Sequence, residues 1–175
     1  MEQKIICFSA CSSEAYKNFQ ESVEQPLSVN QLGKNIKVAI QEVDSSLDSV
    51  SIWAMRYSPK NQKLWEKIDE GDIALFYGNR KFISYGKIIK TLMCEQAAKN
   101  IFGDTIYKLL IIMEKNKAVD QKRDKLWNTF KYSEIARIQG MMIPNIKVQN
   151  ELLQLHNNNI SSLLNDLLEI KDNVG

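Results

Sequence analysis

Two aromatic-rich, strand-like runs joined by a short polar turn constrain the fold of this chain most. The runs are "DIALFYG" and "FISYGKIIKTLM", and "GNRK" connects them. Asparagine and glycine tolerate the backbone conformations that hairpin turns require, so "GNRK" is typical of such a turn. Gly71 supplies a second tight turn before the first run, because glycine has no side chain to clash there. The pattern therefore predicts an antiparallel β-hairpin and, with it, a fold built around a sheet.

Other segments predict further strands on both sides of this hairpin. "EQKIICFSA" and "SVSIWAM" are rich in β-forming residues, and "TIYKLLIIMEK" is so apolar that we expect it in the centre of the sheet. "NIKVAIQEV" alternates Ile36, Val38 and Ile40, which is the two-residue period of a half-buried strand. "MMIPNIKV" is expected to form the last strand.

Short helices are predicted between the strands. "SSEAYKNFQESVEQP" can be capped by Ser12 or Ser13, and "SPKNQKLWEKID" has Ser58 as N-cap with Pro59 at the first helical position. "EQAAKNIFG" is expected to end at Gly103, and "KLWNTFKY" is a further short helix. Strands mixed with short helices in this order indicate an α+β fold.

The pattern changes from Val148 onwards. "VQNELLQLHNNNISSLLNDLLEI" carries apolar residues at helical spacing and contains no aromatic residue. We expect a domain at residues 1–147, including an N-terminal extension, and a C-terminal helix or connector at residues 148–175. That helix either packs back on the domain or leads to a partner or to a further domain.

Composition excludes several classes of protein. The chain has 175 residues, enough for one domain with its own core, and it lacks the run of about eighteen apolar residues that a membrane span needs. Cys7, Cys11 and Cys94 fit no zinc-binding spacing, and the single histidine, His156, lies far from the aromatic stretch. We therefore expect a reduced, cytoplasmic protein with buried thiols, no signal peptide, no metal, no cofactor, no membrane partner and no catalytic residues.

Basic residues are interleaved with the aromatic residues around the hairpin. Such clusters suit a polyanion, although on charge alone a solvated surface explains them equally well. The candidate phosphate-binding residues are Arg56, Lys60, Lys63, Arg80 and Lys81.

The stretch from Ser51 to Ile89 resembles the EVE and YTH branch of the PUA-like superfamily. The residues that carry the resemblance, in chain order, are Ile52-Trp53, Arg56-Tyr57, Asn61, Lys63-Leu64, Gly71-Asp72, Phe76-Tyr77 and Tyr85-Gly86. "TIYKLLIIMEK" and the "LWNTFKYSEIARIQGMMI" that follows it are similar to the later EVE segment, so the resemblance covers about Asn35 to Lys147. It implies an α+β fold with a closed or nearly closed PUA-like β-barrel, surrounding helices and a C-terminal helix.

The resemblance also implies a pocket for one modified nucleobase. Such domains occur as readers of N6-methyladenine in RNA and as the N-terminal specificity domains of McrB-type modification-dependent restriction systems, which flip the base out of duplex DNA. It implies a non-catalytic module that recognises a flipped, methylated base, with modified duplex DNA favoured over RNA and with further domains or restriction subunits as partners. The alternatives are a reader of methylated RNA and an interaction domain whose aromatic residues are only core.

Base recognition outside the stack needs an aromatic wall and a few polar groups. The family's small polar pair after the tryptophan is replaced here by Ala54-Met55, so Ser58 or a backbone group would have to take its place. Trp53 is the first candidate wall, although it can equally be core, and the direction of Tyr85 stays open. The candidate base-binding residues are Trp53, Tyr57, Ser58, Asn61, Tyr77 and Tyr107.

Overall fold

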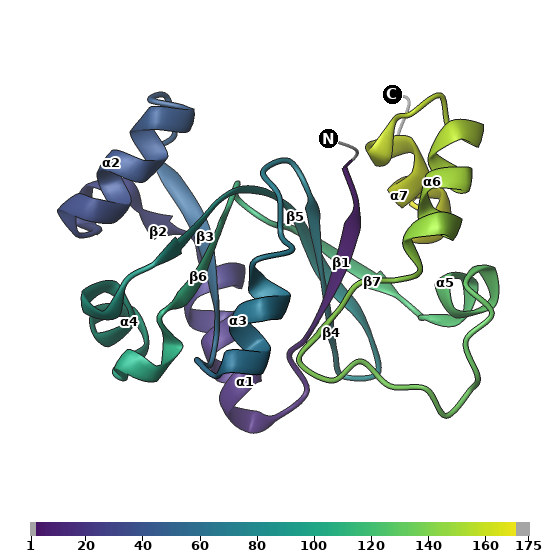
Figure 1. Cartoon of the computed structure of the whole chain (residues 1–175), viewed down its shortest axis with the longest axis horizontal. Coiled ribbons are helices and arrows are strands. Elements are labelled where there is room, and N and C mark those ends of the chain that lie inside the picture. Colours follow the sequence, from purple (N-terminus) through teal and green to yellow (C-terminus); the bar gives the residue numbers. More distant parts are fainter. Residues whose placement is uncertain (1–2, 171–175) are drawn as a thin grey trace.

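A long, bent β-sheet with helices at both ends organises the chain, in a computed structural model that describes residues 3–170 (Figure 1). The strands are β1 (Ile5–Ser9), β2 (Leu27–Ser28), β3 (Ser49–Met55), β4 (Ile73–Gly78), β5 (Lys81–Met93), β6 (Leu109–Met113), β7 (Lys117–Gln121) and β8 (Met141–Met142). The helices are α1 (Ser13–Phe19), α2 (Lys34–Val43), α3 (Pro59–Trp65), α4 (Glu95–Phe102), α5 (Asp124–Thr129), α6 (Ile146–Leu155) and α7 (Ile160–Leu167). A π-helical turn, Gln20–Glu24, extends α1, and the short 3₁₀ helices are Val29–Gln31 and Thr105–Tyr107.

The strand order is β2-β3-β6-β5-β4-β1-β8, with β7 paired to β5 off this path. β1 and β4 are parallel, whereas the other paired strands are antiparallel. The thirteen-residue β5 bends the sheet, because its first half pairs with β4 and β7 and its second half with β6. Bulges in these ladders accompany the bend. The predicted α+β fold is confirmed, but the sheet is not the closed barrel that the resemblance implies: in residues 3–170 no ladder joins β2 to β8.

The predicted hairpin is the β4–β5 connection. Asn79 and Arg80, its two central residues, both have left-handed backbones, with φ of 51° and 65°. This is the geometry of the two-residue turn whose twist matches that of the flanking strands. The hairpin prediction is confirmed, and so are Ser58 as N-cap of α3, Pro59 in its first turn and Gly103 as the left-handed C-cap of α4.

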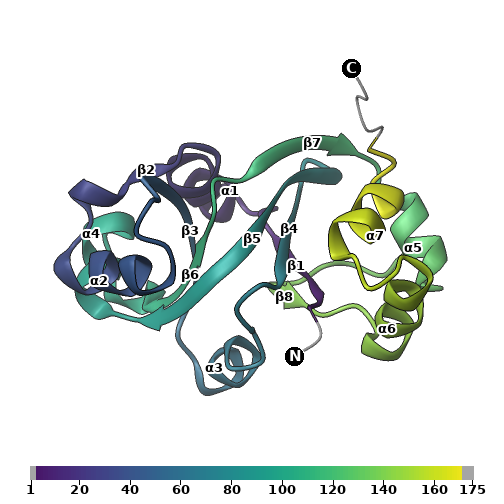
Figure 2. The ribbon, with the colours of Figure 1, turned by 90° about the horizontal axis from the view of Figure 1, so that it is seen from above.

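The sheet buries both of its faces, so its central strands carry apolar residues at nearly every position. Inner-face side chains such as Phe8, Phe76 and Trp53 form one core inside the bend. The outer face of β3 and β6 packs against α2 and α4, and the outer face of β1 and β4 packs against α5, α6 and α7. Figure 2 shows these two groups of helices at opposite ends of the sheet.

The strand predicted for "NIKVAIQEV" is wrong, because this segment forms α2. Ile36 and Ile40 are four residues apart, so they satisfy the two-residue period and also share one face of a helix. Ala39 completes that buried face, whereas Val38, which a strand would place beside Ile36, is exposed. Three alternating residues were too few to separate the two periods.

Two further features of the sheet differ from the predictions. β8 has only two residues, because Asn145 caps α6 and begins the helix inside the predicted last strand. The polar β7 on the edge of the sheet was missed. β1, in contrast, confirms the strand predicted for "EQKIICFSA" and lies between β4 and β8, although the resemblance does not cover this segment.

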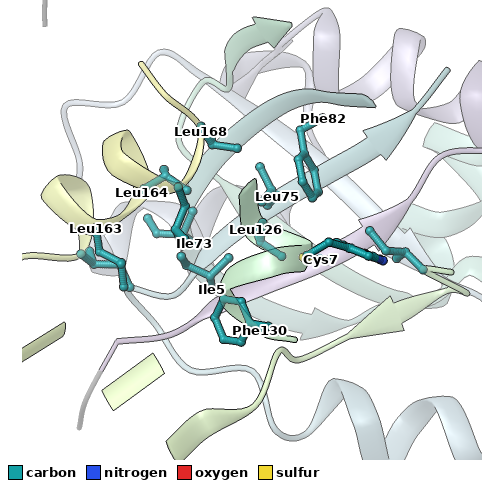
Figure 3. Close-up of a cluster of buried hydrophobic side chains, with 14 of the residues drawn as sticks. Ile5, Cys7, Ile73, Leu75, Phe82, Leu126, Phe130, Leu163, Leu164 and Leu168 are labelled. Carbon is teal, nitrogen blue, oxygen red and sulfur yellow. The ribbon is translucent and has the colours of Figure 1, made fainter. Parts of the chain in front are cut away.

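The C-terminal segment forms two helices in place of the single helix expected. Asn157 and Asn158 adopt left-handed backbones between α6 and α7. Both helices pack on the sheet, where Leu163 and Leu164 of α7 join Ile5 and Ile73 in the outer core (Figure 3). This arrangement corresponds to a helix packed back on the domain. Residues 171–175 of the predicted C-terminal segment lie outside the described residues. Among the helices of residues 3–170, none is both long and apolar enough to cross a bilayer.

Gly86, within the "SYGK" sequence of β5, stands at a position where the structure leaves no room for a side chain. A Cβ atom at this position would lie 2.0 Å from Oδ1 and 2.7 Å from Cγ of Asn116. The Asn116 amide is buried and has no hydrogen-bond partner within the described residues, while its backbone N–H donates to Ser51 Oγ at 3.2 Å. The β6–β7 connection can therefore close over the sheet only where a side chain is missing.

We predict that Gly86→Ala lowers the free energy of unfolding by about 1–3 kcal/mol, because the new methyl group overpacks against Asn116. Urea unfolding of the purified protein measures the change. Gly33→Ala is the matched control, since nothing lies within 4 Å of a Cβ there. In a double mutant with Asn116→Ala the cost of Gly86→Ala should largely disappear. Strict additivity of the two changes would contradict the steric explanation.

Candidate functional site

A cavity of about 270 Å³ opens where β1 and β3 end. Its walls come from the β1–α1 turn, α1, the end of β3, the first turn of α3 and the 3₁₀ turn before β6. Trp53, Tyr107, Glu14, Arg56 and Asn61 supply the side chains that can bind a ligand. Trp53, Arg56 and Asn61 come from the stretch that the sequence singled out, Tyr107 is a further candidate from the sequence, and the structure adds Glu14 to them.

Trp53 serves both the core and the cavity. Its side chain is 7% exposed, and its ring meets Phe76 edge to face at a centroid distance of 5.4 Å in the inner core. It also lines the cavity. The two interpretations left open by the sequence are therefore compatible, because one side of the indole packs inward and the remaining surface is available to a ligand.

Tyr107 forms a second aromatic wall and is 8% exposed. Its hydroxyl donates a hydrogen bond to the carboxylate of Glu14, and the Arg56 guanidinium carbon lies 5.8 Å from its ring centroid. Burial raises the pKa of Tyr107, and the neighbouring Glu14 raises this pKa further because a phenolate would face a carboxylate. The phenol therefore stays protonated as a donor at neutral pH.

Glu14 and Arg56 form an ion pair beside Tyr107, with 3.8 Å between Arg56 Nη1 and Glu14 Oε2. Both side chains are more than half exposed, so solvent screens the pair and its contribution to stability is small. Chemically the pair offers a ligand a carboxylate that accepts hydrogen bonds and a guanidinium that donates them.

Ser58 and Asn61 act together at the start of α3. Ser58 Oγ accepts the backbone N–H of Asn61 at 3.1 Å, and Asn61 Nδ2 donates to the carbonyl oxygen of Arg56 at 2.8 Å. These bonds fix the Asn61 amide at the cavity wall with its Oδ1 free of other hydrogen bonds in the described chain. Ser58 itself is a helix cap and does not line the cavity, so it positions Asn61.

The other two candidate tyrosines lie outside the cavity. Tyr57 is exposed, with Lys108 Nζ 4.3 Å from its ring centroid, and its backbone N–H donates to Ile106, which precedes Tyr107. Tyr77 points to the outer face of β4 and meets Phe82 edge to face at 5.4 Å. Tyr85 also packs against the outer core, which answers the question of its direction. Trp53 and Tyr107 are therefore the two aromatic walls.

Sequence reasoning missed the contribution of the N-terminal segment. The cavity also contains Ser9, Ser12, Asn18 and Gly140, and the backbone N–H of Ser9 donates to the Gly140 carbonyl at 2.8 Å. The available signal was the run of small polar residues after a buried strand, ending in the Ser12 cap of α1. Without a match to the resemblance in this segment, nothing tied it to Trp53.

The candidate phosphate-binding residues fall into two groups around the cavity. Arg56 and the exposed Lys60 and Lys63 of α3 lie on one side, and the two lysines make no ion pair within residues 3–170. Arg80 is at the tip of the β4–β5 hairpin, which adjoins the β1–α1 turn, since the Ala10 N–H donates to the Tyr77 carbonyl at 2.8 Å. Lys81, next to it, pairs with Asp120 at 2.8 Å, so its charge is already partly compensated.

Other chemistry is not assembled in the described residues. No group of three or more His, Cys, Asp or Glu side chains there could hold a metal ion. His156 lies on the C-terminal helices, with Nδ1 3.0 Å from Ser162 Oγ. Burial raises the pKa of the Cys7 thiol to about 12, whereas Cys11 is exposed and Cys94 partly exposed, so only one of the three thiols is fully buried as expected.

We predict that Glu14→Gln lowers the pKa of the Tyr107 phenol, because the carboxylate that opposes phenolate formation is removed. The substitution removes only the contribution of Glu14, and burial still raises the pKa of the Tyr107 phenol in the variant. Ultraviolet titration of the tyrosines measures the change, and Tyr107→Phe identifies the contribution of this residue. An unchanged titration curve in Glu14→Gln would show that the two side chains are not in contact.

Comparison with known proteins places this geometry in a known fold. No protein-family model and no curated protein matches the sequence. The N-terminal domain of Thermococcus gammatolerans McrB bound to m5C DNA is similar in structure, with a TM-score of 0.63, 16% sequence identity and coverage of 89% of this chain and 98% of that one. A second match is the YTH domain of Zygosaccharomyces rouxii MRB1 protein in complex with N6-methyladenosine RNA, with a TM-score of 0.47, 12% identity and coverage of 87% and 86%. The chain therefore has the α+β fold of the McrB N-terminal domain.

Proposed function

We propose that this protein is a non-catalytic nucleic-acid-binding module that holds one methylated base, flipped out of duplex DNA, between Trp53 and Tyr107. The observation that carries the proposal is the cavity itself, which combines two aromatic walls with a few polar groups at its mouth. Its volume of about 270 Å³ is below the roughly 300–1,000 Å³ of sites for drug-sized ligands, so it suits a single planar ring.

The energetics of base flipping fit these walls. Extruding a base from the duplex costs a few kcal/mol of pairing and stacking. Stacking on an aromatic side chain returns about 1–3 kcal/mol per base. Two walls can therefore offset much of the cost, and a methyl group adds apolar surface that Trp53 and Tyr107 can bury.

The polar groups can read the edge of the base. Glu14 is an acceptor for an exocyclic amino group, Asn61 Oδ1 is a second acceptor, and Arg56 is a donor to a ring nitrogen or carbonyl. An ionised Glu14 can only accept and Arg56 can only donate, whereas Asn61 already spends one amide hydrogen on the Arg56 carbonyl. A base that places its amino group near Glu14 would be accepted, and one that places a carbonyl there would be rejected.

The similar McrB domain supports DNA as the ligand, since it was observed with m5C DNA. By the same analogy we propose that the chain is a specificity module of a modification-dependent restriction system, and that further domains or subunits carry out cleavage. The unpaired cations of α3 and the hairpin support a polyanionic partner, because they flank the cavity where a phosphate backbone would run.

We predict that Trp53→Leu lowers affinity for the modified base by roughly ten- to a hundredfold, the equivalent of about 1–3 kcal/mol of lost stacking. The measurement is a binding screen of matched oligonucleotides carrying 5-methylcytosine, 5-hydroxymethylcytosine, N6-methyladenine or no modification, each as duplex and single strand and as DNA and RNA. The loss should fall on the preferred modification and spare unmodified DNA, which binds through its phosphates. Leucine is chosen over alanine because Trp53 is also core, and a large cavity there would unfold the protein.

Trp65→Leu is the matched control for this substitution. This substitution also removes an indole, together with the hydrogen bond from Trp65 Nε1 to the Leu110 carbonyl. Trp65, however, does not line the cavity. It should lower the melting temperature and keep the preference for the modified base. Equal preference for modified and unmodified oligonucleotides in the wild type, or an unaltered preference in folded Trp53→Leu, would overturn the proposal.

We predict that replacing Lys60 and Lys63 together by alanine weakens binding to modified and unmodified DNA alike. Each phosphate contact contributes about one unit to the slope of log affinity against log salt, so the slope should become shallower by about two units. Salt titrations of the variant and the wild type on the same duplex provide the measurement. Lys34 and Lys37 of α2, at the far end of the sheet, serve as the paired control and should leave the slope unchanged (Figure 1). A loss confined to modified DNA would mean that the α3 lysines read the base.

A further inference from the structure

Ile135 is presented to solvent at the tip of a tight turn. Its exposed fraction of 86% is the highest among the exposed large hydrophobic side chains of the described chain. The turn spans residues 133–136 and is closed by a hydrogen bond from the Ala136 N–H to the Ser133 carbonyl at 3.0 Å, so Ile135 is one of its two central residues. Glycine, asparagine, aspartate, proline and serine dominate such positions, and isoleucine gives the turn no conformational advantage.

The guanidinium of Arg123 stabilises this turn through two hydrogen bonds to its backbone. It donates to the Glu134 carbonyl at 2.6 Å and to the Ala136 carbonyl at 2.7 Å. These are the carbonyls on either side of Ile135. Arg123 is itself held over the Trp127 ring, with 4.9 Å between its guanidinium carbon and the ring centroid. The two charge-assisted bonds turn both carbonyls inward and leave the isoleucine side chain on the outside.

The neighbouring residues of the segment are anchored in the outer core. Tyr132 and Ala136 pack against that core, and Ile138 is buried in it. Arg137, in contrast, is exposed and has no ion-pair partner in residues 3–170. The segment therefore packs its other apolar residues near the turn against the outer core and leaves Ile135 outside, with the exposed Glu134 and Arg137 near it.

The turn lies on the side of the molecule that holds the cavity. The segment between α5 and β8 runs along the lower side of Figure 1, as do α1, α3 and the tip of the β4–β5 hairpin. Gly140, at the end of this segment, lines the cavity and accepts a hydrogen bond from Ser9. Gly140 is five positions after Ile135 in the chain, so the two residues are at most about 18 Å apart. This upper limit corresponds to about five stacked base pairs at 3.4 Å each, so one duplex can contact both features.

We infer that Ile135 is a positioning residue that enters the base stack and fills the gap left by the base held in the cavity. The inference rests on the proposed function. Proteins that open a duplex insert apolar side chains such as isoleucine between base steps. A braced turn suits this role, because a flexible side chain or loop would lose entropy on insertion. Arg137 then contacts the phosphate next to the gap.

This role assigns duplex DNA as the ligand in preference to a single strand. A single strand presents its bases already unstacked, so it leaves no gap and gains nothing from Ile135. The cavity and Ile135, which we call the wedge because it enters the base stack, therefore contribute to different steps: the cavity binds the base, and the wedge fills the gap in the duplex. Trp53 and Tyr107 hold the base in either kind of strand, whereas Ile135 stabilises only the opened duplex.

The test compares Ile135→Ser with the wild type on a DNA duplex and on its single strand. Both carry the modification preferred among 5-methylcytosine, 5-hydroxymethylcytosine and N6-methyladenine. We expect affinity for the duplex to fall on the order of tenfold while affinity for the single strand is unchanged. The fluorescence of 2-aminopurine beside the modified base, which rises when the stack opens, should rise less with the variant. Ile135→Met should restore both, since methionine is also used as a wedge.

Leu155→Ser is the matched control. Leu155 is 79% exposed at the end of α6, among the C-terminal helices, and should affect neither form of DNA. Unchanged duplex affinity in Ile135→Ser, or equal losses on duplex and single strand, would overturn the wedge while leaving the base-binding cavity intact. If instead no modification is preferred by the wild type, the proposed function fails, and the wedge fails with it.

Discussion

The rest of the structure depends on the position of β1 in the sheet, which is fixed by hydrogen bonds at the start of the strand. β4 pairs with the whole of β1, but β8 pairs with only Cys7 and Phe8, so the backbone groups at the start of the strand are satisfied by side chains on that side. The Lys4 N–H donates to buried Asp72, and the Ile5 N–H and carbonyl bond to the buried amide of Gln149 at 2.7 and 3.1 Å. Because an unpaired buried backbone group costs as much as a lost hydrogen bond, these two side chains determine where β1 can lie.

Asp72 also connects the start of β1 to the turn before β4. Its other oxygen accepts the Asp69 N–H at 2.8 Å and lies 2.6 Å from Lys4 Nζ. Burial works against the charge on Lys4, but Asp69 and Asp72 outweigh it and raise its pKa, so the lysine stays charged. A buried carboxylate is tolerated when it is paired and hydrogen-bonded in this way. In the sequence, Gly71-Asp72 stands out only as part of the resemblance. In the structure, Asp72 joins the start of β1 to the turn before β4.

Much of the sheet was predictable because its strands carry local signals. The turn at Asn79-Arg80 and the helix caps at Ser58 and Gly103 depend on neighbouring residues alone, and the structure has them where the sequence predicts. α2 was not predictable, since Ile36 and Ile40 fit both periods and only packing against α4 and the sheet decides between them. Only part of the residue set that lines the cavity could be predicted from the sequence. Trp53, Arg56 and Asn61 belong to one contiguous stretch, whereas Glu14 and Gly140 reach the cavity through β1 and the residues beside it, which no local pattern reveals.

The alternation of side chains along β1 links the cavity to the turn that carries Ile135. Ile6 and Phe8 face the inner core that supports Trp53, and Ile5 and Cys7 face the outer core that anchors the segment around Ile135. At the end of the strand, Ser9 joins the two sides through its hydrogen bond to Gly140. A one-residue shift of β1 would exchange its faces and disrupt both cores at once. The distance between the cavity and the Ile135 turn is thus fixed by one strand register, as the proposed roles of the cavity in holding a base and of Ile135 in filling the gap require.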